Sequence, residues 1–179
     1  GAMSAVLGMD AEVIEDVLND REGVSIANYN CPGQIVITGE AAAVAEAGTA
    51  LKEAGARRVL PLKVSGPFHS PMMRPAGEEL AKVFAGVSMN PLKIPYVANI
   101  NAEVITDCGR IEGLLVDQVS GSVRWQQSVE TMIREGVDTF VEIGPGTALS
   151  KFVKKTCPEI TCYSVEKVAD VDALLEKLA

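Results

Sequence analysis

The chain is poor in several residue types that common functions require. Its 179 residues include one histidine, aromatic side chains make up only 4%, and the formal net charge at pH 7 is -8. Because a nucleic-acid surface needs clustered positive charge, this balance argues against nucleic acid as a partner. No apolar run approaches the roughly 18 residues that suggest a transmembrane helix, and no signal peptide with a basic start is visible. We therefore expect a soluble, cytoplasmic protein without a membrane partner.

Cysteine is also scarce, and its spacing excludes two kinds of site. The four cysteines are scattered, at Cys31, Cys108, Cys157 and Cys162. With one histidine in the chain, a zinc site would need most of these thiols to converge from distant segments, and a disulfide framework does not suit an intracellular composition. We expect no metal site and four reduced, mostly buried thiols.

The first 62 residues predict six elements in the order strand, helix, strand, strand, helix, strand. The expected strands are 3–7, 24–28, 34–38 and 58–63, and the expected helices are one capped by Asp10 and one over 40–54. Segment 30–33 carries the Pro-Gly signal of a turn and Gly55 stands where a helix C-cap belongs. The order βαββαβ is typical of the ferredoxin-like arrangement, which hosts many functions and so names none.

Residues 63–179 alternate differently. Helices are expected over 72–87, 111–119, 125–134, 148–155 and 171–178, and strands over 96–100, 103–106, 139–143 and 161–165. The first helix should face inward with Met73, Ala76, Leu80 and Val83. Helices alternating with apolar strands, including a buried strand at 139–143, predict a parallel sheet covered on both faces.

The single histidine, His69, lies in a loop fixed by Gly66, Pro67 and Pro71. An unperturbed imidazole, with a pKa of about 6.5, can take up and return a proton near neutrality. This residue is therefore a candidate general base. The loop alone favours an ordinary surface histidine, or one whose hydrogen bonds are satisfied within the loop, over a catalytic one.

A glycine-rich turn at 142–147 joins an expected strand to an expected helix. Backbone N–H groups at such a helix N-terminus can hold an anion or a substrate oxygen. The alternative is a tight turn in which Thr147 caps the helix. Segment 28–39 is read as a hairpin with an architectural role.

Taken in order, five segments are specific enough to indicate a family. They read MSAVLG (3–8), NYNCPGQ (28–34), VSGPFHS (64–70), VRW (123–125) and EIGPG (142–146). Across essentially its whole length, the chain resembles malonyl-CoA:acyl carrier protein transacylases. The resemblance implies an α/β-hydrolase-like core with an inserted ferredoxin-like subdomain. Residues 1–62 would form the ferredoxin-like subdomain, and 63–179 the C-terminal portion of the core.

The resemblance also implies a reaction. Malonyl-CoA would acylate a serine, and the phosphopantetheine thiol of acyl carrier protein would then take the malonyl group, as in fatty-acid biosynthesis. His69 would move the protons, oriented by the backbone carbonyl of Gln118, so that the Gln118 side chain would matter little. Phe68 would favour malonyl over branched acyl groups, or else simply pack in its loop. No cofactor is implied, because the CoA thioester is the substrate.

The family's nucleophile is missing from this sequence. The nearest approach to a Gly-x-Ser-x-Gly elbow lies at 23–27, where Ser25 leads into a strand and the last glycine is absent. Arg57, Arg58 and Arg124 do not match the arginine that binds the malonyl carboxylate. We therefore expect a C-terminal three-fifths of the enzyme, inactive alone, whose partners include the missing N-terminal segment.

Other interpretations remain open. The chain could be an acyltransferase domain cut from a larger synthase. The chain could be a non-catalytic module that binds an acyl ligand or a partner. Lys151, Lys154 and Lys155, at i, i+3 and i+4 of one helix, could dock the carrier protein or form a solvated face.

Overall fold

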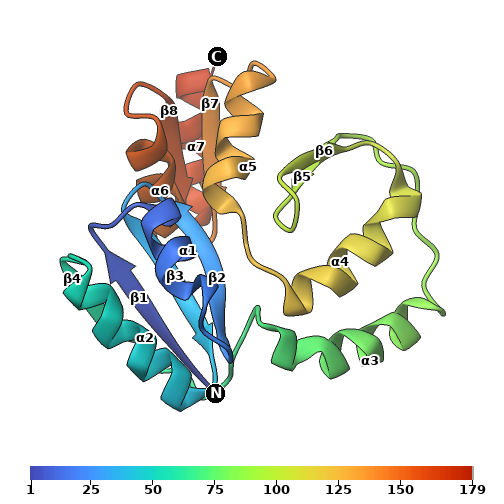
Figure 1. Ribbon diagram of the computed structural model, residues 1–179. Helices are drawn as coiled ribbons and strands as arrows, with labels where there is room; N and C mark the ends of the chain where they lie inside the picture. Colours follow the sequence, from blue (N-terminus) through green and yellow to red (C-terminus); the bar gives the residue numbers. More distant parts are fainter. Residues whose placement is uncertain (179) are drawn as a thin grey trace.

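The computed structural model describes residues 1–178, and Ala179, the end of the second predicted domain, lies outside the described residues. It is a mixed α/β structure (Figure 1). The first region contains β1 (Ala2–Leu7), α1 (Ala11–Asn19), β2 (Val24–Cys31), β3 (Gln34–Gly39), α2 (Ala41–Glu53) and β4 (Arg58–Pro61). Its strands form one antiparallel sheet in the order β2-β3-β1-β4.

The two helices of this region close the sheet's larger core. Side chains alternate along a strand, so Val6, Ile35 and Ile37 share one face and pack with buried residues of α1 and α2. On the opposite face, Met3 and Val36 form a smaller buried cluster. The region therefore encloses a hydrophobic core with elements that are all local in sequence.

The edge strand β2 is interrupted by a bulge at Ala27. Ile26 pairs with Ile37 and Asn28 with Val36, which leaves Ala27 as an extra residue. The bulge lets Ile26 and Tyr29 face the same core although they are three residues apart. It also presents the Ala27 carbonyl outward, and Val123 binds there.

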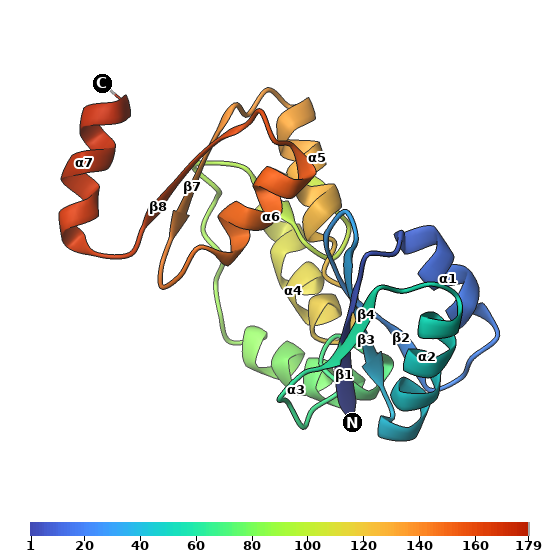
Figure 2. The same cartoon turned by 90° about the vertical axis from the view of Figure 1, so that its left-hand side faces the viewer.

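The second region contains two short 3₁₀ turns, η1 (Pro71–Met73) and η2 (Cys108–Arg110), among five helices and four strands. The helices are α3 (Arg74–Phe84), α4 (Ile111–Ser120), α5 (Trp125–Arg134), α6 (Ala148–Thr156) and α7 (Val168–Leu178). The strands are β5 (Tyr96–Ala98), β6 (Glu103–Ile105), β7 (Thr139–Ile143) and β8 (Thr161–Val165). In Figure 2, β8 and α7 extend away from the four-stranded sheet, whereas α3 and α4 pack against each other.

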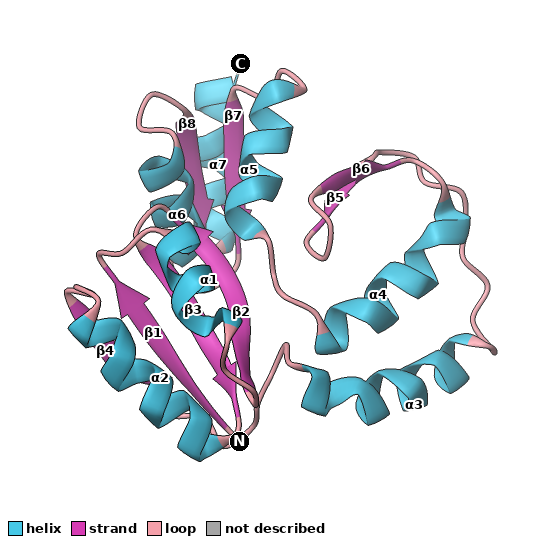
Figure 3. Cartoon of the chain, in the orientation of Figure 1, coloured by secondary structure: helices cyan, strands magenta, loops and turns pink. Residues whose placement is uncertain are grey.

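The expected parallel sheet is present only as one pair. β7 and β8 are parallel and joined through α6, whereas β5 and β6 form an antiparallel hairpin (Figure 3). The prediction that 139–143 is a buried strand is wrong, because Ile143 is 81% exposed and Val141 is exposed as well. Within residues 1–178, this pair has no further strand beside it, and apolar sequence alone does not supply one.

The predicted inner face of the first helix in this region is wrong in part, although Met73 and Leu80 are half-buried as expected. Ala76 and Val83 are exposed on α3, while Gly77 is buried against the Val116 carbonyl of α4. Because α3 packs mainly on α4, the close approach of the two backbones at Gly77 decides which face turns inward.

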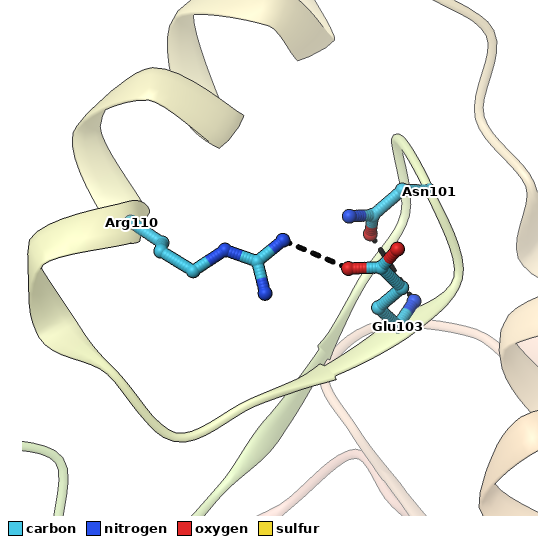
Figure 4. A network of polar contacts seen from close by, with 3 residues as sticks. All are labelled: Asn101, Glu103 and Arg110. Atoms are coloured by element: carbon cyan, nitrogen blue, oxygen red, sulfur yellow. Dashed lines mark hydrogen bonds and ion pairs between the residues drawn. The ribbon is translucent and has the colours of Figure 1, made fainter.

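Polar contacts fasten the β5–β6 hairpin to the turn before α4. Figure 4 shows Arg110, which donates to Glu103 at 2.8 Å, and Asn101, whose Oδ1 accepts from the Glu103 amide at 3.1 Å. The pair is exposed, so it orients the hairpin and adds little to stability.

None of the helices within residues 1–178 is both long and apolar enough to cross a membrane. The four cysteines are free, as predicted, but only Cys31 is buried. The other three thiols are partly exposed, because the second region encloses them less completely than the sheet encloses Cys31.

Candidate functional site

The loop that carries His69 has a defined and strained geometry. His69 adopts φ 57°, in the left-handed region that non-glycine residues rarely occupy. The buried Ser70 side chain donates to the Pro67 carbonyl at 2.7 Å and closes the loop behind the histidine. Strain of this kind costs about 1–3 kcal/mol and persists where the surroundings enforce it.

The imidazole of His69 meets the residue that the spacing predicted. Its Nδ1 atom lies 3.0 Å from the carbonyl oxygen of Gln118. A carbonyl oxygen can only accept a hydrogen bond, so Nδ1 carries the proton in this contact. In the neutral ring, Nε2 then keeps its lone pair and is the nitrogen able to act as a base. The structure brings the two residues together, and their catalytic role stays a prediction.

The Gln118 carbonyl is available because of its place in α4. The last four carbonyls of a helix have no partner within the helix, and α4 ends at Ser120. The chain then leaves in an extended conformation at Gly121. A free helix-end carbonyl therefore takes the position that a carboxylate holds in a Ser-His-Asp triad.

Phe68 stands beside the histidine and is 46% exposed. A Cβ on Gly66 would lie 2.9 Å from the Phe68 ring, so the ring rests over the backbone of this glycine. Gly66 thus permits a ring position that any larger residue would change. A role for Phe68 in substrate selection stays a prediction.

Two backbone N–H groups in the first turn of α6, just after the turn at 142–147, are already bound within the chain. The Glu142 carboxylate accepts from the amides of Leu149 and Ser150, at 3.1 and 2.8 Å, at the N-terminus of α6. Thr147 occupies the N-cap position but its side chain makes no capping hydrogen bond. The helix end already holds an anion supplied by the chain itself.

This arrangement also sets the ionisation of Glu142. Partial burial by itself raises the pKa of the carboxyl group, but hydrogen bonds from Ser150 and Leu149 and the charge of Lys151 outweigh it. The pKa of Glu142 is lowered below its ordinary value.

The three predicted docking lysines lie on α6 beside a groove of about 900 Å³ that Gln34 and Cys162 also line. Two of the ammonium groups have neutral partners. Lys155 donates to the side chain of Gln34 at 3.2 Å, and Lys154 to the carbonyl of Pro158 at 3.1 Å. In these contacts Lys154 and Lys155 meet no acidic group, and docking stays a prediction.

Arg124, which does not match the substrate arginine, has a structural contact instead. Its guanidinium lies 5.5 Å from the centre of the Tyr29 ring, whose hydroxyl donates to Glu15 at 2.6 Å. Burial, together with Glu15, raises the pKa of Tyr29 to about 12. Among the described residues, no cluster of histidine, cysteine or acidic side chains is suited to hold a metal ion.

The segment that connects α4 to α5 and hydrogen-bonds to the first region could not be recognised from the sequence. Residues 121–124, the bridging segment, run beside the bulged edge of β2, where Val123 forms a parallel bridge with Asn28. Only the short VRW motif marked this stretch, and it carries no signal for a strand.

Comparison with known proteins finds relatives of this chain. A family model described as "Acyl transferase domain" matches residues 1–174. A malonyl CoA-acyl carrier protein transacylase from Bacillus subtilis is 42% identical over 182 residues, covering 99% of this chain and 57% of its own length.

Solved structures give the same result. An acyl carrier protein S-malonyltransferase from Vibrio cholerae superposes with a TM-score of 0.93 at 40% identity, over 97% of this chain and 57% of the other. A malonyl-transacylase in complex with its type II PKS acyl-carrier protein gives a TM-score of 0.94 at 37% identity, over 98% and 58%. The chain thus spans less than three fifths of the length of these relatives.

Proposed function

This chain belongs to the acyl transferase domain family, and we propose that it supplies the proton-transferring base for malonyl transfer from malonyl-CoA to acyl carrier protein. The observation that carries the proposal is the contact between His69 Nδ1 and the Gln118 carbonyl, which leaves Nε2 free to act. The names of the relatives supply the substrates, and the site supplies a base of the required kind.

The reaction would proceed in two halves. In the first, a serine outside this sequence attacks the thioester carbonyl of malonyl-CoA while His69 Nε2 takes the serine proton and then gives it to the departing CoA thiolate. In the second, the same nitrogen takes the proton of the phosphopantetheine thiol as its sulfur attacks the acyl-serine, and the proton returns to the serine. The Gln118 carbonyl holds the ring and stabilises its charged form in each half.

The proposal extends to the architecture. The antiparallel βαββαβ sheet would be the ferredoxin-like subdomain, and the rest would be the C-terminal part of an α/β-hydrolase-like core. The missing N-terminal segment of the same enzyme would then be a partner of the second region. The exposed apolar residues of β7, such as Ile143, support a partner at this strand. The reaction would use no cofactor besides the CoA thioester substrate.

A chimera tests the function. The 57% of the Bacillus subtilis relative that aligns with this chain is exchanged for residues 1–179, and malonyl transfer to carrier protein is measured. We expect transfer well above the uncatalysed rate. A chimera that folds, as judged by circular dichroism, but transfers no malonyl group contradicts the proposal.

The isolated chain provides a second measurement. Because no nucleophile elbow occurs in its sequence, we expect no stable malonylation after incubation with malonyl-CoA. Intact mass spectrometry checks this. A mass gain of one malonyl group, removed by mild base, would show that the chain carries its own nucleophile.

A further inference from the structure

The side chain of Gln118 is itself engaged at the end of α4. Its Nε2 donates to the carbonyls of Gly121, at 2.9 Å, and Ser122, at 3.3 Å. Because carbonyl oxygens only accept, the amide nitrogen must occupy this position. One residue therefore contacts His69 through its backbone and the bridging segment through its side chain.

The bridging segment is anchored in turn on the edge of β2. The Ser122 hydroxyl donates to the Ile26 carbonyl at 2.6 Å, and the Val123 amide donates to the Ala27 carbonyl at 2.7 Å. The Tyr29 amide returns a bond to the Val123 carbonyl at 2.8 Å. The bulge at Ala27 makes these β2 groups available, so the sheet of the first region holds the segment in place.

The backbone at Gly121 is closely surrounded by other atoms of the chain. A Cβ at this position would overlap the Ile100 side chain and lie 3.0 Å from the Asp117 carbonyl. The residue between Gln118 and the anchored part of the segment is therefore held on both sides.

We propose that the Gln118 amide is a positioning group for His69: by tying the end of α4 to the β2 edge, it holds the Gln118 carbonyl at Nδ1. Without the amide, the last turn of α4 keeps only its backbone bonds and the carbonyl is free to turn toward water. This proposal opposes the expectation that the Gln118 side chain matters little, and the experiment below decides between them. The catalytic meaning of this role rests on the proposed function, but the positioning itself does not.

The single histidine makes the test direct. In ¹⁵N-labelled protein, the imidazole nitrogen shifts report the ratio of Nδ1–H to Nε2–H tautomers of His69 alone. We expect Gln118→Met, which keeps the length but removes the donor, to lower this ratio about two- to tenfold, the size of one ordinary hydrogen bond. Gln126→Met is the matched control, because it removes only an exposed bond to Glu130, and it should leave the ratio unchanged.

A folded Gln118→Met protein with an unchanged tautomer ratio would overturn the inference, since the amide would then be only a helix-end contact. If Gln118→Met does not fold, a second pair decides. Ser122→Ala removes the bond to Ile26, and Ser122→Thr keeps a hydroxyl. A lower ratio in the alanine variant alone supports positioning, and no change in either variant contradicts it.

The readout is independent of turnover, so the two proposals can fail separately. A tautomer shift in Gln118→Met together with an inactive chimera would keep the positioning inference and reject the transfer function. An active chimera in which the ratio does not respond to Gln118→Met would do the reverse.

Discussion

The two regions of the molecule bury their apolar residues very differently. In the first, α1 and α2 cover one face of a four-stranded sheet and enclose residues such as Ile14, Ile37 and Leu51 completely. In the second, the largest buried cluster consists of Val129, Val153 and Ile160. Most of the large exposed apolar residues of the described chain also lie in the second region.

The difference shows where local sequence is sufficient to build a core. The first region completes its own core because its helices and strands alternate within about sixty residues. Within residues 1–178, the second region contains β7 and β8 as a pair without a further strand. The histidine loop lies at its boundary with the first region. We therefore expect the contact between His69 and Gln118 to depend on the bridging segment more than on a core of the second region.

The largest effect is expected for a substitution at His69, compared with one in the first region. In the chimera, His69→Ala should lower kcat for malonyl transfer by about 10²- to 10⁴-fold, the usual contribution of a general acid–base group. Ser25→Ala, in the first region, should leave transfer unchanged. A loss of less than tenfold for His69→Ala would assign proton transfer to another group.

The next effect compares one residue type in the two regions. Ile37 is fully buried and Ile143 is 81% exposed, and both lie in strands. We expect Ile37→Ala to cost about 2–5 kcal/mol of unfolding free energy and Ile143→Ala to change it by at most about 0.5 kcal/mol. Urea unfolding monitored by circular dichroism measures both. Similar losses would remove the contrast between the regions.

Substitutions at two glycines of the second region test the role of the bridging segment. Gly121→Ala forces a Cβ toward Ile100 and should cost about 1–3 kcal/mol. Gly113→Ala, within α4 and with nothing within 4 Å of the added carbon, should stabilise the protein by about 0.5–1 kcal/mol. Thermal unfolding shows whether each substitution raises or lowers the stability. An unchanged stability for Gly121→Ala would mean that the backbone and Ile100 adjust easily to the added carbon.

The smallest effect concerns Glu142 and pH. Its pKa is lowered in the folded state, so the stability it contributes is present above the unfolded pKa of about 4.3 and is lost as pH falls through the folded value. Glu142→Gln should therefore be less stable than the parent at pH 7, and the gap should close on acidification. Unfolding curves at several pH values check this, with the exposed Glu46→Gln as the control. A gap that widens in acid would contradict the assigned sign.

Several elements could be predicted from the sequence to the residue. The ranges 125–134, 139–143 and 161–165 coincide with α5, β7 and β8, because apolar periodicity is clear there and polar residues bound it. The inner face of α3 could not be predicted, since it depends on where α4 approaches. Nor could the capping, because Asp10 makes no side-chain hydrogen bond to the helix it precedes.

The contacts of the candidate site could likewise be predicted only in part. The family resemblance placed the carbonyl of Gln118 next to His69, and the structure confirms that contact. Two contacts could not be predicted: the hydrogen bond from the Gln118 amide to the Gly121 carbonyl, and the binding of the Glu142 carboxylate at the N-terminus of α6. Each depends on groups that only the folded chain brings together. Motifs identify residue types, and they do not say which hydrogen bonds are already taken.

The left-handed backbone at position 69 sets folding against chemistry at one residue. Glycine adopts such a conformation without a steric penalty, so His69→Gly would relax the loop in the act of removing the imidazole. A search for more stable versions of this protein would tend to select that change. If the proposed function is right, the selected protein would be more stable and would lack its base.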